Sequence, residues 1–205
     1  MQLRLKCDLT SEEYVSAEAW HDATLERCPF HPAGDCDFAR HGTYRRKTPL
    51  GTRIPRWYCP TAHRTVSLLA DCFAARLPGT LADIEQVVDV VEQSPSFEAA
   101  ADRLRPDIEL PGALRWIRRR TDAIALTLSL IKGLWPDRLA DVPPTLAGFR
   151  QALAISAVLT PLRERFEPRL PQLLRPLGFR PWGARSSARK PHQHPMGPDP
   201  PPDTP

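Results

Sequence analysis

The sequence predicts an α+β fold, in which a small β domain precedes a mainly α-helical domain and a proline-rich tail that we expect to be disordered. Strand-like alternation of apolar and polar residues is confined to the part before residue 76, and helical spacing of apolar residues dominates from residue 77 onward. Eight of the 24 prolines lie between residues 181 and 205. The chain of 205 residues therefore divides into unlike segments rather than forming one continuous helical bundle.

Residues 1–26 are expected to form a strand and a short helix. Apolar and polar side chains alternate over residues 2–9, which is typical of a half-buried strand. Thr10 stands three residues before Glu13, a capping-box pattern that predicts a helix reaching about residue 19.

Residues 27–76 are rich in Cys, His, Gly, Pro and aromatic residues, and they lack a helical period. Strand-like pieces occur at 38–46, 53–59 and 65–69, and Pro49 and Gly51 predict a turn between the first two. This segment is therefore expected to be a small β domain.

Residues 77–134 predict three helices with short connections. Thr80 is a suitable N-cap for the first helix, the second can start at Ser94 with Pro95 in its first turn, and the third runs over 110–134. Residues 135–180 predict two further helices, at 146–159 and 161–174.

Composition excludes several classes of protein. No apolar run reaches the roughly 18 to 20 residues that span a bilayer, and Arg4, Lys6 and Asp8 stand where a signal peptide would be apolar, so we expect a cytoplasmic protein without a membrane partner. Five cysteines are an odd number, which does not suggest a closed disulfide framework. In a reducing compartment, clustered Cys and His indicate a metal site.

Two pairs of candidate ligands predict a Zn²⁺ site. Cys28 and His31 form one pair and Cys59 and His63 the other, and four such ligands complete a tetrahedron around zinc. In an alternative set Cys36 replaces His31, and His41 is a third candidate. No motif of a catalytic metal site accompanies these residues, so the sequence predicts a structural site and no enzyme.

Basic residues predict two surfaces for nucleic acid. One follows the strands of the β domain, where basic and aromatic residues alternate with few acids, and the other lies on the helix over 110–134, on the side opposite its apolar stripe. The candidate DNA-binding residues are Arg40, Tyr44, Arg45, Arg46, Lys47, Arg53, Arg56, Arg115, Arg118 and Arg119.

A resemblance to a known family agrees with both the candidate zinc ligands and the basic surfaces. The stretches CPFHPAGDCDFARHGTYRRK, RIPRWYCPTAHRTVSLL, SFEAAADRL and ALRWIRRR resemble the amino-terminal zinc-ribbon and helix-turn-helix region of insertion-sequence transposases and related short proteins, over roughly residues 25–133. The resemblance implies DNA binding during transposition or its regulation, with Cys28, His31, Cys59 and His63 on ligand positions. The commoner ribbon of this kind has four cysteines, whereas here the second residue of each ligand pair is a histidine, His31 or His63.

The sequence has no room for the catalytic core of such a transposase, because only about 45 structured residues are expected after Leu134. We therefore expect a zinc-dependent protein that binds double-stranded DNA without catalysis. Its further partners would be a transposase or a second copy, bound through the helices after residue 135. The alternative is a zinc-stabilised adaptor that binds acidic protein and no nucleic acid.

Overall fold

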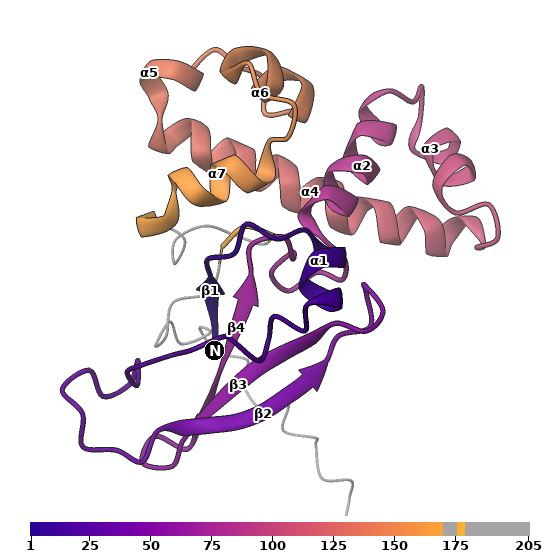
Figure 1. Cartoon of the computed structure of the whole chain (residues 1–205). Coiled ribbons are helices and arrows are strands. Elements are labelled where there is room, and N and C mark those ends of the chain that lie inside the picture. Colours follow the sequence, from indigo (N-terminus) through magenta and orange to yellow (C-terminus); the bar gives the residue numbers. More distant parts are fainter. Residues whose placement is uncertain (170–175, 179–205) are drawn as a thin grey trace, which may run out of the picture.

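Residues 1–169 and 176–178 are described by the structure, a computed structural model (Figure 1). They form a four-stranded sheet and several helices, which confirms an α+β fold. The tail over 181–205 and the end of the helix expected at 161–174 lie outside the described residues. The division into five segments stays a prediction.

The sheet has the strand order β1-β4-β3-β2. The three strands predicted at 38–46, 53–59 and 65–69 are confirmed, and they form an antiparallel meander in which Arg45 pairs with Arg53 and Cys59 pairs with Arg64. β1 lies parallel to β4, with Gln2 opposite Ser67. The strand bounds are β1 Gln2–Leu5, β2 Ala39–Arg45, β3 Arg53–Cys59 and β4 Arg64–Ala70.

Capping residues begin several helices where the sequence predicts them. Thr10 and Thr80 each close a capping box, with Glu13 and Asp83 respectively. The second helix of the helical part begins later than expected, because Ser96 rather than Ser94 accepts a hydrogen bond from the helix, at the amide of Ala99. The described helices are α1 Ser11–Ser16, α2 Leu81–Glu92, α3 Phe97–Leu104, α4 Leu110–Leu134, α5 Pro136–Leu139, α6 Leu146–Leu153 and α7 Leu159–Arg165, followed by a 3₁₀ turn over Glu167–Arg169.

The region after Trp135 differs most from expectation. The short helix α5 was not predicted, and the helix expected over 146–159 ends at Leu153. Ala154 follows it in a left-handed conformation with φ 53°, which turns the chain before α7.

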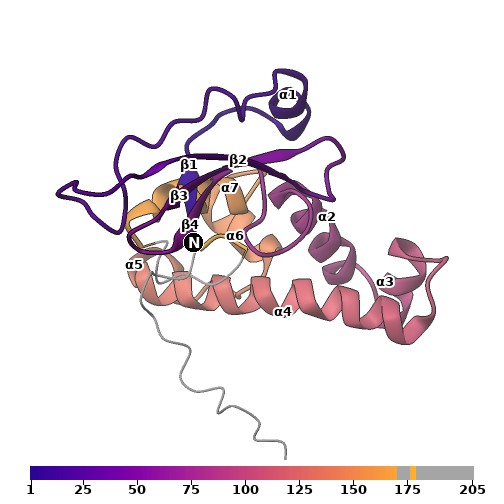
Figure 2. The same cartoon turned by 90° about the horizontal axis from the view of Figure 1, so that it is seen from below.

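One large core joins the sheet to the helices. It contains Ile54 and Leu69 of the sheet, Ile84 of α2, and Ile124 and Leu128 of α4, all at most 1% exposed. Figure 2 shows the sheet between α1 on one side and α4 and α7 on the other. A smaller core, around Ala100, Ala101, Ala113 and Ile117, packs α3 against the first half of α4, away from the sheet.

Acidic residues of α2 hold the beginnings of two later helices. The Glu85 carboxylate accepts hydrogen bonds from the amides of Val158 and Leu159, and the Glu92 carboxylate accepts from those of Leu146 and Ala147. These amides have no partner within their own helices, so α2 caps α6 and α7 from outside.

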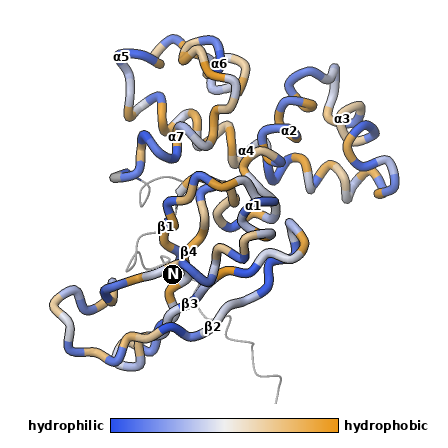
Figure 3. Tube along the Cα trace, viewed as in Figure 1, coloured by the Kyte–Doolittle hydropathy of each residue, from blue (hydrophilic) through white to orange (hydrophobic). Residues whose placement is uncertain are grey.

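In the hydropathy colouring, β4 is mostly hydrophobic whereas β2 is mostly hydrophilic (Figure 3). This contrast agrees with burial, since five of the seven residues of β4 are buried and none of β2 is. Within residues 1–169 and 176–178, no helix combines the length and the hydropathy that a membrane span requires.

Candidate metal centre

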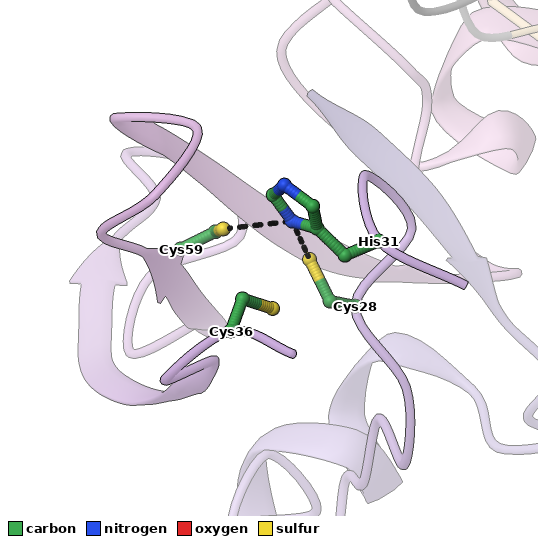
Figure 4. A group of neighbouring side chains, drawn as sticks. All are labelled: Cys28, His31, Cys36 and Cys59. Atoms are coloured by element: carbon green, nitrogen blue, oxygen red, sulfur yellow. Dashed lines mark hydrogen bonds between the residues drawn. The ribbon is translucent and has the colours of Figure 1, made fainter. Parts of the chain in front are cut away.

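Four side chains with metal-binding atoms converge at the open end of the β2–β3 hairpin, where β2 begins and β3 ends. They are Cys28, His31, Cys36 and Cys59 (Figure 4). Their ligand atoms all lie within 4.8 Å of one another, which is close enough to bind a metal ion. Cys59 ends β3, and the other three come from the segment that precedes β2. The group therefore ties that segment to the sheet.

Local backbone structure brings these residues together. The amide of His31 donates to the carbonyl of Cys28, which makes a tight turn between the two. Gly34 and Asp35 then have φ of 101° and 62°, and this left-handed pair turns the chain so that Cys36 faces the first two residues. The amide of Ala62 donates to the sulfur of Cys59 over 3.3 Å.

The sulfurs differ in how readily they ionise. Burial raises the pKa of the Cys28 thiol, but hydrogen bonds from His31 and from the backbone of Phe30 and His31 outweigh it and bring the pKa to about 7. Burial and hydrogen bonds to Cys28 and Cys59 raise the pKa of Cys36 to about 11. Cys28 is therefore the thiol of the pair that ionises first.

Three of the four residues predicted as zinc ligands, Cys28, His31 and Cys59, lie together in the structure, and the fourth member of the group is Cys36. His63 lies outside the group: it is exposed in the turn after β3 with φ 49°, and its Nδ1 is 3.4 Å from the hydroxyl of Tyr58. Cys36 joins the group beside His31 instead of replacing it. His41 also lies outside the group, exposed on β2.

Two of the arginines proposed to bind DNA have partners inside the molecule. The Arg40 guanidinium donates to the carbonyls of Trp20, His21 and Ala23 and lies over the ring of Trp57. The Arg46 guanidinium donates to the carbonyls of Thr48, Ala74, Leu77 and Gly79. Both side chains hold neighbouring segments against the hairpin.

Other basic residues of the hairpin face solvent. Arg45, Lys47 and Arg53 are exposed, and Arg45 and Arg53 stand directly opposite each other across β2 and β3. Arg56 is half-buried over the ring of Tyr44, with 5.7 Å between its guanidinium carbon and the ring centre.

The basic residues of α4 are also exposed at its beginning. Arg115, Arg118 and Arg119 face solvent, and Arg118 lies over the ring of Phe97. Arg120 is buried against Trp116, 3.9 Å from the ring centre. The turn of the β2–β3 hairpin and the beginning of α4 lie toward the same side of the molecule in Figures 1 and 2.

Neither protein-family models, nor curated proteins, nor solved structures give any match to this chain.

Proposed function

We propose that the protein is a DNA-binding protein stabilised by structural zinc, and that it has no catalytic activity of its own. The observation that carries the proposal is that a group of three cysteines and one histidine lies at one end of a hairpin whose other end carries two exposed arginines, Arg45 and Arg53.

The donor set favours zinc. Thiolates and imidazole are the ligands of structural zinc sites, whereas magnesium and calcium prefer oxygen. A tetrahedral zinc with ordinary bond lengths separates sulfur and nitrogen ligands by about 3.5 Å. His31 Nδ1 lies 3.6 Å from the sulfur of Cys28 and 3.4 Å from that of Cys59. Four protein ligands leave no open position, which supports a structural role.

The charges of the hairpin favour a polyanionic partner. Like charges directly opposite in a sheet destabilise it by a few tenths to about 1 kcal/mol. Among the described residues, no hydrogen bond or ion pair involves the side chains of Arg45 or Arg53. A phosphate backbone would relieve this repulsion, and the exposed arginines of α4 would add contacts to the same backbone.

The test is binding of random duplex DNA by the zinc-loaded full chain at low and moderate salt. We expect Arg45→Gln/Arg53→Gln and Arg115→Gln/Arg119→Gln each to weaken binding about tenfold. The slope of the logarithm of the binding constant against the logarithm of the salt concentration should also become shallower, by roughly one unit for each lost phosphate contact. Arg138→Gln/Arg165→Gln is the control, because it also removes two exposed charges, one in α5 and one in α7, both of which lie over the ring of Trp135, the residue that follows α4. Absence of binding even at low salt contradicts the proposal, as does an equal loss in the control.

A second candidate function is a protein-interaction adaptor. Leu126 and Leu130 stand one turn apart on α4 and are 52% and 38% exposed, which is unusual for leucines on a packed helix. Tight binding of an acidic protein without any affinity for duplex DNA would favour this candidate.

A further inference from the structure

A cavity of about 460 Å³ lies between the end of α1 and the turn that joins β2 to β3. Val15 and Trp20 line it from the α1 side, and Arg45, Leu50, Thr52 and Arg53 line it from the hairpin. It is at the opposite end of the hairpin from the candidate metal centre, since Cys59 ends β3 and Arg53 begins it. The volume is in the range of pockets that hold small ligands.

Two residues that line the cavity, Trp20 and Thr52, each carry a polar atom that is buried behind the wall and has no hydrogen-bond partner among the described residues. Trp20 and Thr52 are 3% and 1% exposed, and neither the indole Nε1 of Trp20 nor the hydroxyl of Thr52 makes a hydrogen bond to any described residue. A buried donor without an acceptor costs free energy. An indole N–H can only donate, so the group that would satisfy it must be an acceptor.

The same wall carries unbalanced positive charge. Arg45 and Arg53 face each other across the strands at the cavity, and neither guanidinium has a partner among the described residues. Arg46 also lines the cavity, but its guanidinium already donates to four backbone carbonyls. Glu18, the one acid among the described residues that line the cavity, pairs with His21 over 3.4 Å.

We propose that this cavity binds the phosphate of a nucleotide. Phosphate oxygens are acceptors that match the exposed guanidinium groups of Arg45 and Arg53, and Trp20 lies in the same wall, where its indole can report a bound phosphate. Val15 and Leu50 give the cavity an apolar side for a sugar or base, and Leu50 is 90% exposed at its rim. The nucleotide is either part of a DNA strand or a free nucleotide. The first source rests on the proposed DNA binding, and the second does not.

The experiment is an NMR titration of the zinc-loaded full chain, labelled with ¹⁵N, in which the indole N–H signal of Trp20 is followed. The signal is identified by its loss in Trp20→Phe. Inorganic phosphate, 2′-deoxyadenosine 5′-monophosphate and a short single-stranded oligonucleotide are added in turn. We expect a saturable shift of the Trp20 signal with the mononucleotide or the oligonucleotide. Tighter saturation by the mononucleotide identifies a free nucleotide as the source, and tighter saturation by the oligonucleotide identifies a strand.

Variants separate this site from other anion binding. Arg45→Gln/Arg53→Gln should weaken the titration at least tenfold. The control Arg138→Gln/Arg165→Gln should titrate as the unmodified chain does. The backbone amide spectrum shows that each variant is folded.

The outcomes distinguish the cavity from the proposed function. A Trp20 signal that no phosphate compound moves, or that moves equally in the Arg45→Gln/Arg53→Gln variant, overturns the cavity proposal even if duplex DNA binds elsewhere. A saturable Trp20 shift in a protein that binds no duplex DNA supports the cavity and overturns the proposed function.

Discussion

The membership of the metal group depends on the backbone conformation of single residues. Gly34 and Asp35 adopt positive φ, and the loop turns back so that Cys36 reaches Cys28 and His31. His63 also has positive φ, and its ring lies beside Tyr58 outside the group. Spacing predicts that Cys28, His31 and Cys59 lie close together. It does not predict the left-handed turns that decide between Cys36 and His63.

Single substitutions test this ligand set. Cys36→Ser should lower bound zinc from one equivalent to well below half, because it removes one of four ligands, whereas His63→Ala should keep the full equivalent. Zinc is measured by atomic emission on purified protein after dialysis. The reverse pattern, with loss in His63→Ala and retention in Cys36→Ser, would show that the ligands are those predicted from the sequence.

At the scale of elements, α2 acts as an anchor for the helices that follow. Glu85 is only 6% exposed, and it binds the amides that begin α7 as well as the guanidinium of Arg150, which also pairs with Asp89. In the sequence these acids are only negatively charged positions spaced three and four residues apart along the helix. Their partners lie 54 to 74 residues away, so no local pattern predicts them.

Removal of the anchor should therefore destabilise the fold. Glu85→Ala should lower the free energy of unfolding by about 3 kcal/mol or more, because it leaves buried amides and a cation without their acceptor. Glu92→Gln should cost less, about 1 kcal/mol, as expected for a helix cap. Urea unfolding followed by circular dichroism measures both. Asp102→Asn on the exposed side of α3 is the control and should change stability by less than about 0.5 kcal/mol.

At the scale of the whole molecule, the large core and the candidate metal centre consist of different residues and hold different parts of the chain together. The core that joins the sheet to α2, α4, α6 and α7 includes none of the four grouped residues. Periodicity and capping residues predict most of its elements, and β2, β3, β4, α2 and α4 lie close to their expected bounds. After Trp135 the start of α6 at Leu146 was predicted, but α5 and the end of α6 at Leu153 were not. The amides that begin α7 are bound by Glu85 of α2, a distant contact that no local pattern predicts.

Metal removal should therefore disorder one region and spare the rest. Chelation is expected to speed hydrogen exchange in residues 27–38 and at the Cys59 end of the hairpin by at least tenfold, while amides of α4 stay protected. Exchange followed by mass spectrometry, with and without chelator, measures the difference. Uniform loss of protection throughout the chain would show that metal and core form one cooperative unit.

The parallel pairing of β1 with β4 has a consequence for the order of events in folding. β2, β3 and β4 follow one another through short turns and can pair as neighbours, but Gln2 must find Ser67 across the whole meander. Contacts between distant parts of a chain form more slowly than local ones, because a long loop must close first. The strand that comes first in the chain is thus expected to be the last to join the sheet.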